Sequence, residues 1–480
     1  MFDERKLSLL TDFYELTMAN AYFNDSRKDE IAVFDLFFRR IPDNGGYAIF
    51  AGLEQVIDYL KNLNFNDAEI KFLRQKKIFN EDFLVYLKNF KFSCDVYSFE
   101  EGTPIFPNEP IMVIKGPIIE CQLIETFLLL SINFQSLIAT KAARIVRSAQ
   151  GKPVLEFGAR RAHSYDAAIL GARAAYIGGV IGSSNTFADY RYQVPAFGTM
   201  AHSYIQSFKN EYEAFKSYAL NFPDNTVLLV DTYDTLNSGI PNVIKVNEEV
   251  LKPLGKTVAG IRIDSGDLAY LSIKARQLLD EAGMTETKIS VSNSLDEYLI
   301  KDLLTNQNAK IDQFGVGERL ITSRSEAVFG GVYKLSAIQK GKDLIPKIKI
   351  SDNTAKTTIP GFKQVYRFYD QQQKAIADVI TLFNEVIDES KPYRLFDPNH
   401  PWKEKIVTKY QAVPLLKPIF KAGKCIYQTP TINDIRKYSR LQLDTLWQEM
   451  LRLDYPHQYY VDLSQALWDL RQIMIDDYRK

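Results

Sequence analysis

The stretch VAGIRIDSGD, residues 258–267, has the form of a buried β-strand that ends in charged residues. A short apolar run bounded by turn residues is typical of a strand covered on both faces. The form recurs between helical segments, in KPVLEFG (152–158), TVLLVDTYD (226–234), KISVSNS (288–294) and IDQFGVGE (311–318). Strands that alternate with helices over about 200 residues predict a parallel sheet. Because no Gly-rich dinucleotide fingerprint accompanies these strands, we expect an irregular, TIM-like α/β barrel rather than a doubly wound sheet.

The segments before and after this region have a different pattern. IAVFDLFFRR (31–40) predicts a strand, GLEQVIDYLKNL (52–63) an amphipathic helix, and residues 120–148 a long helix. After residue 345 the chain predicts shorter strands and a helical tail. We therefore expect three consecutive parts: residues 1–135, a barrel domain of residues 136–345, and residues 346–480.

Composition and charge exclude several classes of protein. Of the 480 residues 46% are hydrophobic, and 59 lysines and arginines balance 59 aspartates and glutamates, so no net field favours nucleic acid or an anionic membrane. The charged start MFDERK is unlike a signal peptide, and the apolar run LIETFLLLSINF (123–134) is too short to cross a bilayer. Cys94, Cys121 and Cys425 lack metal-ligand spacing. We expect a cytoplasmic protein without nucleic-acid or membrane partners.

Charged residues gather at the predicted strand ends. Alternation along the strand places Arg262 and Asp264 on one side, where a guanidinium can clamp a phosphate or carboxylate. The carboxylate can hold Mg²⁺ or stabilise a carbocation; the alternative is a buried structural ion pair. Asp231 follows the apolar run TVLLV, and Arg160 follows KPVLEFG.

His202 lies in AFGTMAHSYIQSF, residues 196–208, and is one of four histidines in the chain. If Thr199 caps a helix that starts here, His202 falls in its first turn. The helix dipole there favours an anion and disfavours an imidazolium, which leaves a neutral ring able to act as nucleophile or base. The alternative is a partly buried histidine with a structural role.

Glycine-rich turns complete the set of strand-end features. Gly315 and Gly317 follow an apolar run, and backbone amides in such turns can approach a phosphate closely. Neither a P-loop nor a Rossmann fingerprint occurs in the sequence. The residues together favour an anionic, phosphorylated substrate. No predicted strand end offers the lysine that a Schiff-base lyase or aldolase needs.

Seven motifs in order resemble the nicotinate phosphoribosyltransferase family: LLTDFYELTMANAYF, EFGARRAHS, GSSNTFA, GTMAHSYIQSF, DTYDTLNSG, IRIDSGDL and FGVGERLITS…FGGVYKL. The resemblance implies that nicotinate and phosphoribosyl pyrophosphate give nicotinate mononucleotide and pyrophosphate in NAD salvage. ATP hydrolysis would be coupled through a phosphohistidine, a ligase-type chemistry added to glycosyl transfer. It also implies a barrel beside an α/β sandwich domain built from both terminal segments, and a homodimer with its active site at the interface.

The resemblance also implies roles for individual residues. His202 would receive the ATP phosphate, Asp231 would bond that histidine, and Asp264 would lie near the ribose and Mg²⁺. Nicotinate would stack between Phe157 and Tyr14 of the partner subunit. The other implied binding residues are Arg160, Asn185, Thr199, Arg262, Gly315, Gly317 and Glu318.

Two features leave alternatives open. Glu318 stands where many relatives have threonine, and its carboxylate would repel a phosphate unless Mg²⁺, Arg319 or an outward rotamer intervenes. Nicotinamide phosphoribosyltransferase is the nearest alternative, but Asn185 stands near the position where that group has an aspartate, which favours nicotinate. A barrel enzyme acting on another phosphorylated substrate is the remaining alternative. ATP and Mg²⁺ are the expected co-substrate and cofactor.

Overall fold

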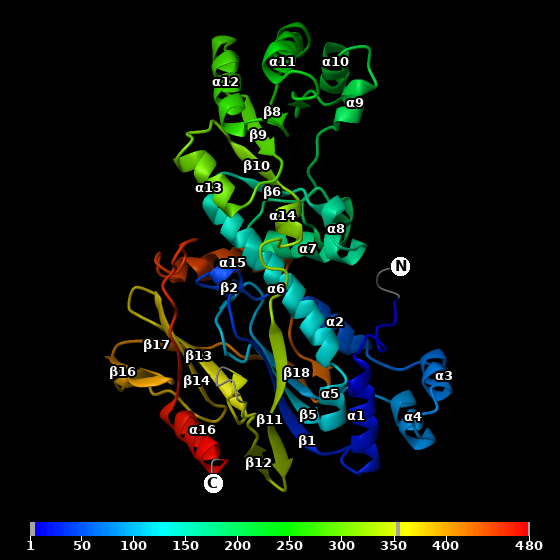
Figure 1. Cartoon of the computed structure of the whole chain (residues 1–480), viewed down its shortest axis with the longest axis vertical. Helices are drawn as coiled ribbons and strands as arrows, with labels where there is room; N and C mark the ends of the chain where they lie inside the picture. The colour runs from blue at the N-terminus through cyan, green and yellow to red at the C-terminus, as the bar shows by residue number, and fades with distance from the viewer. Residues whose placement is uncertain (1–4, 352–355, 479–480) are drawn as a thin grey trace. The chain divides into compact units, whose positions relative to one another are not determined.

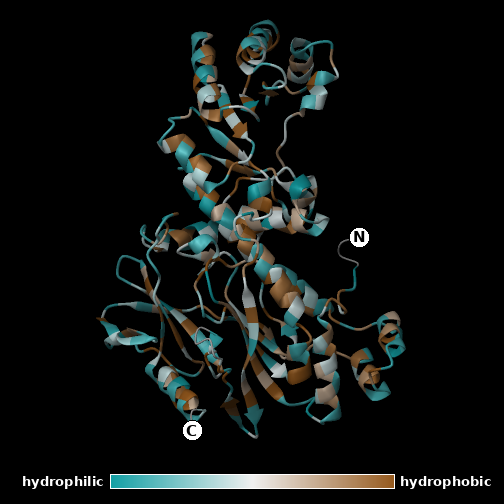
Figure 2. Ribbon diagram, in the orientation of Figure 1, coloured by the Kyte–Doolittle hydropathy of each residue, from teal (hydrophilic) through white to brown (hydrophobic). Residues whose placement is uncertain are grey.

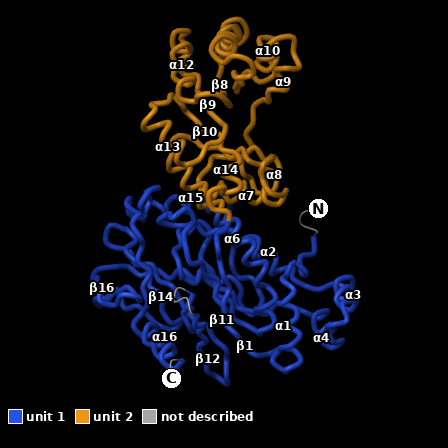
Figure 3. The backbone as a smooth tube through the Cα atoms, viewed as in Figure 1, with its two compact units in different colours: residues 1–137, 328–480 blue, residues 138–327 orange. Residues whose placement is uncertain are grey.

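The computed structural model describes residues 5–351 and 356–478 of a mixed α/β protein. The chain divides into two compact units: unit 1 is residues 1–137 with 328–480, and unit 2 is residues 138–327 (Figure 3). Both terminal segments therefore contribute to unit 1. The second boundary lies at 327, not at 345, because strand β11 (Gly331–Lys340) pairs with β1 (Ile31–Phe38) of unit 1.

Unit 1 is built on an antiparallel sheet of seven strands (Figure 1). Their order is β12 (Asp343–Pro346), β11, β1, β5 (Met112–Pro117), β3 (Asp95–Ser98), β18 (Lys417–Lys421) and β19 (Lys424–Cys425). Strand β1 pairs antiparallel with both β11 and β5. Its side chains are buried from Ala32 to Phe38, so both faces of this strand are covered. This explains why its sequence is a continuous apolar run rather than an alternating one.

Smaller sheets and helices complete unit 1. The second sheet contains β17 (Gln411–Pro414), β13 (Lys363–Tyr369), β14 (Ala375–Leu382) and β20 (Val461–Leu463), in that order. A two-stranded sheet pairs β15 (Tyr393–Asp397) with β16 (His400–Val407). Another pairs β2 (Ala48–Ile49) with β4 (Pro104–Ile105). The helices are α1 (Phe13–Asn24), α2 (Leu53–Asn62), α3 (Asp67–Gln75), α4 (Glu81–Lys88), α5 (Ile118–Gln122), α15 (Ile432–Thr445) and α16 (Gln465–Asp477).

The main core of unit 1 gathers buried side chains from the seven-stranded sheet and from helices beside it, among them Val33 of β1, Leu60 of α2 and Leu73 of α3. As the spacing predicts, α2 buries Leu53, Ile57 and Leu60 on one face. In Figure 2 helix surfaces alternate between hydrophobic and hydrophilic residues, as expected of helices with one buried face.

Helix α6 (Glu125–Ser148) is the longest helix in the described chain. The helical stretch Ile118–Ser148, which contains the apolar run of residues 123–134, is long and apolar enough to cross a membrane by length and composition alone. However, 67% of its most apolar window is buried inside the protein. A buried core helix passes the same test, because it too is apolar on most sides.

Unit 2 contains a parallel sheet in the order β6 (Val154–Glu156), β10 (Gln313–Val316), β9 (Lys288–Ser292), β8 (Gly260–Ile263) and β7 (Val227–Leu229). Its helices are α7 (Tyr165–Ile177), α8 (Thr186–Tyr192), α9 (His202–Gln206), α10 (Glu211–Asn221), α11 (Ile240–Val246), α12 (Leu268–Glu281), α13 (Glu297–Thr305) and α14 (Glu318–Ile321). The predicted alternation of strand and helix is confirmed.

The described strands of unit 2 do not close into a barrel. Beyond β6 the pairing continues only as isolated bridges, from Glu156 to Ser183 and from Ser183 to Ala196. The segment that carries these bridges is mostly loop around α8, so it supplies no strand able to complete the ring. The structure therefore does not show the expected irregular, TIM-like barrel, and the sheet of unit 2 stays open.

Candidate active site

The candidate site lies at one edge of the parallel sheet of unit 2 (Figure 1). The carboxyl ends of parallel strands meet at the same edge, so residues that follow them converge although they are far apart in sequence. Phe157 follows β6, Asp231 follows β7, Asp264 follows β8 and Gly317 follows β10. The sequence prediction that strand-end residues gather in one place is thus met by the topology.

Arg262 and Asp264 face the same side of β8, as alternation predicts. The guanidinium Nη2 lies 3.4 Å from Asp264 Oδ2, and the two side chains are only 18% and 25% exposed. Ser292 joins them: Arg262 Nε donates to Ser292 Oγ at 3.1 Å, and Ser292 Oγ donates to Asp264 Oδ1. Arg262 Nη1 also points to Thr199 Oγ1, at 3.4 Å.

Asp231 fixes the turn that follows β8. Its Oδ2 accepts from the Asp264 amide at 3.0 Å and from Ser265 Oγ at 2.5 Å. Its Oδ1 is buried and has no hydrogen-bond partner among the described residues. The resemblance implies a bond from Asp231 to the His202 ring; in this structure Asp231 bonds the Asp264 turn instead.

His202 is the first residue of α9, and its side chain is 41% exposed. Its Nδ1 lies 3.1 Å from Thr232 Oγ1, and its Nε2 lies 4.0 Å from Asp264 Oδ2. The helix N-cap is Ala201, which has no capping side chain, so the expectation that Thr199 caps it was wrong. Thr199 instead faces Arg262.

The chain after Ala201 forms two separate helices, α9 and α10. Asn210 caps α10 by accepting from the Glu213 amide at 3.0 Å. Because an asparagine side chain satisfies a free amide at a helix start, the chain begins a new helix there.

Phe157 and Gly315 lie against each other. A Cβ added at Gly315 would lie 2.5 Å from Phe157 Cδ2, so only glycine leaves room for the ring. The Arg262 guanidinium carbon lies 6.0 Å from the centroid of that ring. Gly315 is a buried strand residue paired with Leu155 and Ser292, so packing gives it a second reason to be glycine.

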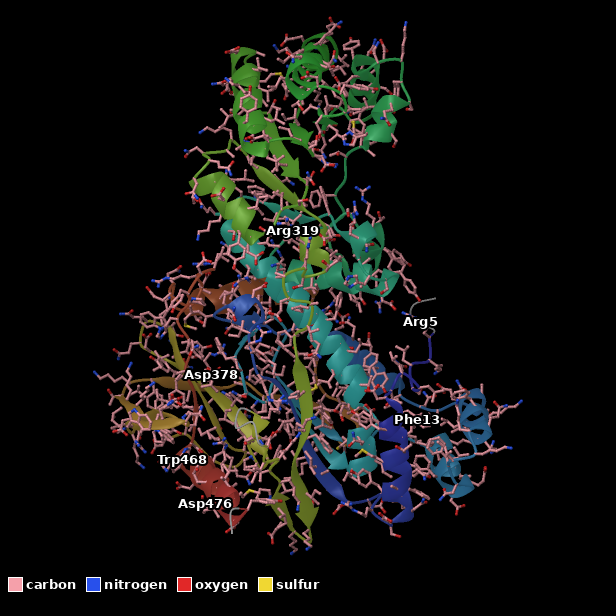
Figure 4. All side chains as sticks on the ribbon, in the orientation of Figure 1. Arg5, Phe13, Arg319, Asp378, Trp468 and Asp476 are labelled. Atoms are coloured by element: carbon pink, nitrogen blue, oxygen red, sulfur yellow. The ribbon has the colours of Figure 1, made fainter. Side chains whose placement is uncertain are left out.

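Gly317 and Glu318 form the turn from β10 into α14. Glu318 is the first residue of α14 and pairs with Arg324 Nη1 at 3.6 Å. Arg319, labelled in Figure 4, pairs with Asp296 and not with Glu318. The cation that pairs with Glu318 is therefore Arg324, and not Arg319 as the sequence suggested.

Two other predicted residues lie on unit 2 in different roles. Arg160 is exposed in the 3₁₀ turn Ala159–Arg161 after β6. Asn185 caps α8, where its Oδ1 accepts from the amides of Phe187 and Ala188 and its Nδ2 donates to the Ala168 carbonyl. These bonds use both acceptor positions of Asn185 Oδ1 and one of its two Nδ2 hydrogens, so Asn185 has a structural role at the start of α8.

Tyr14 lies on α1 of unit 1 and is 45% exposed. Burial of the hydroxyl end, followed by the nearby Glu125 carboxylate that it bonds, raises the pKa of Tyr14. A partly exposed aromatic side chain whose hydroxyl is held by a carboxylate suits a ring that stacks on a flat ligand.

Sequence reasoning missed three residues that hold the site together. Ser292 joins Arg262 to Asp264, and Thr232 meets the His202 ring. Glu156 is fully buried and accepts from Ser183 Oγ at 2.5 Å and from the Gly158 amide; burial raises its pKa. The sequence does carry a signal for Ser292, because it is the last residue of a strand, as Ile263 is just before Asp264. Thr232 lies directly after Asp231, and no pattern in the sequence marks its hydroxyl.

The arrangement combines a guanidinium, two carboxylates, an accessible imidazole and an aromatic ring at one sheet edge. The guanidinium can bind phosphate, and a carboxylate beside it can oppose positive charge on a reacting sugar. A histidine at a helix start can carry a phosphoryl group. These groups suit transfer chemistry on a phosphorylated sugar.

Three family models match the chain. Residues 9–133 match the nicotinate phosphoribosyltransferase N-terminal domain, residues 153–385 match the nicotinate phosphoribosyltransferase family, and residues 362–471 match the nicotinate phosphoribosyltransferase C-terminal domain.

Individual proteins resemble it over nearly their whole length. The chain is 46% identical to nicotinate phosphoribosyltransferase of Bacillus subtilis, covering 100% of this chain and 97% of the relative. It is 40% identical to a nicotinate phosphoribosyltransferase of Mycobacterium tuberculosis, over 96% and 92%. The crystal structure of human nicotinic acid phosphoribosyltransferase superposes with a TM-score of 0.85 at 29% identity, covering 97% of this chain and 100% of that one.

Proposed function

Since the chain belongs to the nicotinate phosphoribosyltransferase family, we propose that it joins nicotinate to phosphoribosyl pyrophosphate, releasing nicotinate mononucleotide and pyrophosphate in NAD biosynthesis. ATP hydrolysis is coupled to this reaction through His202. The observation that carries the proposal is the meeting of Arg262, Asp264 and His202 at one sheet edge.

Each group has a step suited to its chemistry. Arg262 binds a phosphate group of phosphoribosyl pyrophosphate. As pyrophosphate leaves C1 of the ribose, positive charge develops on the ring, and the Asp264 carboxylate opposes it. The nicotinate nitrogen then forms the new bond to C1, with the pyridine ring held against Phe157. Gly317 offers its amide to the 5′-phosphate, and Thr199 and Arg160 add polar contacts.

His202 takes the γ-phosphoryl group of ATP on a ring nitrogen, releasing ADP. Water later cleaves the nitrogen–phosphorus bond and releases phosphate. The contact between Nδ1 and Thr232 orients the ring for this transfer. Asp231 supports the turn that carries Asp264 rather than the ring itself.

The residues present fit a magnesium ion that arrives with substrate. Within the described residues no group of three or more His, Cys, Asp or Glu side chains could hold a metal. However, the buried Asp231 Oδ1 has no partner there, and Asp264 follows the adjacent strand. Mg²⁺ usually binds one or two carboxylates together with substrate phosphates, and it would neutralise charge on the leaving pyrophosphate.

We also propose how the chains assemble and what the sheet of unit 2 does. Tyr14 stacks on the nicotinate ring bound by a partner subunit, so the active enzyme is a homodimer. Its proposed location is the cytoplasm. The five parallel strands, extended by the bridges at Ser183 and Ala196, act as an irregular barrel-like layer that aims the strand ends at the substrate.

Mononucleotide formation by the purified protein tests the activity. We expect product from nicotinate and not from nicotinamide, with phosphoribosyl pyrophosphate and Mg²⁺ present, and a faster rate with ATP. Product from nicotinamide instead would assign the other base, and product from neither would reject the proposal.

His202→Ala tests the coupling to ATP. The variant should keep the rate seen without ATP and lose the stimulation, because only the phosphoryl acceptor is removed. A variant that ATP still stimulates would show that His202 does not carry the phosphoryl group.

A further inference from the structure

Ser292 makes two contacts with oppositely charged partners. It ends β9, is 6% exposed, and its hydroxyl accepts from Arg262 Nε while donating to Asp264 Oδ1. A serine hydroxyl has one donor and two acceptor positions, so it can satisfy both groups at once. Ser292 therefore stands between the cation and the anion on which the proposed reaction depends.

The direct contact between those two charges is long. Arg262 Nη2 and Asp264 Oδ2 are 3.4 Å apart, whereas charge-assisted bonds close to about 2.7–2.9 Å. A guanidinium and a carboxylate that are free to approach form two parallel bonds, using Nε with Nη2 and both carboxylate oxygens. The Ser292 hydroxyl occupies Nε and Oδ1, which are two of the atoms that such a pair would use.

The other hydrogen bonds of the Arg262 guanidinium are longer and hold it less firmly than the bond to Ser292 does. Nη1 reaches Thr199 Oγ1 at 3.4 Å and the Met200 carbonyl at 3.5 Å, both near the limit for a hydrogen bond. Nε to Ser292, at 3.1 Å, is the shortest hydrogen bond that the guanidinium makes to a described residue. The guanidinium is thus oriented mainly by Ser292.

The neighbouring strand gives Ser292 a fixed place. Ser292 pairs with Gly315 of β10, and a Cβ at Gly315 would lie 3.4 Å from Ser292 Cβ. The backbone register and the packing around Gly315 therefore set where the Ser292 Cβ lies, and the hydroxyl reaches Arg262 and Asp264 from that point.

We propose that Ser292 is a positioning residue that keeps Arg262 and Asp264 from closing into a bidentate ion pair, so that both remain available to phosphoribosyl pyrophosphate. This inference rests on the proposed function. Without the hydroxyl, Arg262 turns onto Asp264, and the substrate must break that pair before it binds.

The test compares Ser292→Ala with Ser290→Ala. Ser290 lies two residues earlier on the same face of β9, and the hydrogen bond of its hydroxyl reaches Gln313 at 3.5 Å. Titration calorimetry measures the Kd of phosphoribosyl pyrophosphate with Mg²⁺, and steady-state assays measure KM for each substrate. Ser292→Ala should weaken binding of phosphoribosyl pyrophosphate by about tenfold, with KM for nicotinate unchanged, and Ser290→Ala should match the wild type.

The same substitution made in the Asp264→Asn variant distinguishes a positioning role of Ser292 from a general structural defect. In Asp264→Asn there is no carboxylate onto which Arg262 can close, so adding Ser292→Ala should change Kd by less than about twofold. An equal loss in both backgrounds, or no loss in Ser292→Ala alone, would overturn the inference. Wild-type protein that neither binds phosphoribosyl pyrophosphate nor forms mononucleotide would instead overturn the proposed function, and the inference with it.

Discussion

At the scale of single residues, Gly315 matters both for packing against Phe157 and for the geometry of the candidate site. The Phe157 ring takes the space that a side chain at 315 would need, and the ring also lies near Arg262. A change at this glycine therefore reaches the site through Phe157 rather than through the substrate phosphate alone.

Gly315→Ala should lower both stability and affinity for the pyridine base. The added methyl overlaps the Phe157 ring, and relieving such an overlap costs about 1–3 kcal/mol. Urea unfolding measures the loss, and KM for nicotinate should rise. Gly198→Ala is the control, because a Cβ there meets nothing within 4 Å. Equal unfolding free energies for the two variants would contradict this packing role.

Asp462 of β20 links the stability of unit 1 to pH. Burial, aided by the nearby Asp397 carboxylate, raises the pKa of Asp462 to about 7. The folded protein therefore holds this proton between about pH 4 and pH 7 while the unfolded chain has lost it. The stabilisation that the protonated Asp462 provides is complete below the pKa that this group has in the unfolded chain. It is lost as the pH rises through about 7.

Asp462→Asn should remove this dependence, because the amide stays neutral at every pH. We expect the variant to exceed the wild type in unfolding free energy at pH 8 by on the order of 3 kcal/mol, and to differ little at pH 4. Urea unfolding of both proteins across this range measures it. A variant with the slope of the wild type would assign the pH dependence to another group.

At the scale of elements, strands β13 and β14 are joined by a buried ion pair. Arg367 and Asp378 are opposite each other in register and fully buried, with Nε–Oδ1 at 2.8 Å and Nη2–Oδ2 at 2.6 Å. Asp378 is labelled in Figure 4. Tyr459 also donates to Asp378 Oδ1, at 2.9 Å, which ties the segment before β20 to this sheet.

Asp378→Asn should destabilise unit 1 strongly, since it removes the carboxylate that makes two hydrogen bonds with the buried Arg367 guanidinium. The expected loss is about 3–5 kcal/mol in unfolding free energy. Glu404→Gln serves as control: its pair with Arg394 also joins two adjacent strands but is exposed, and such pairs contribute about 1 kcal/mol or less. Similar losses in the two variants would show that burial does not set the strength of these pairs.

At the scale of the whole molecule, the dimer that we propose would make each site depend on two chains. Tyr14 comes from unit 1, whereas Arg262, Asp264 and His202 come from unit 2. If Tyr14 acts in the partner's site, a defect in one chain can be complemented by a chain with a different defect.

Mixing Tyr14→Ala with Asp264→Asn should therefore restore activity that each variant lacks alone. Random exchange of subunits leaves one intact site in half of the dimers, so we expect recovery to about a quarter of the wild-type rate. The rate of mononucleotide formation after unfolding and refolding the mixture measures it. No recovery, with dimers present, would place Tyr14 in the site of its own chain.

The sequence by itself determined the alternation of strands and helices in unit 2 and the shared side of Arg262 and Asp264. These follow from local periodicity, which depends only on neighbouring residues. The seven motifs also identify the family from the sequence. In the same way the burial of α2 follows from its apolar spacing.

The tertiary structure decided what depends on residues distant in sequence. The sheet of unit 2 stays open because the segment around Ser183 pairs only through single bridges, and β11 joins unit 1 because β1 offers it a free edge. The partners of His202, Glu318 and Asp231 were likewise set by elements brought together in folding. Hydrogen bonds and ion pairs depend on distances of a few ångströms, which periodicity along the chain does not encode.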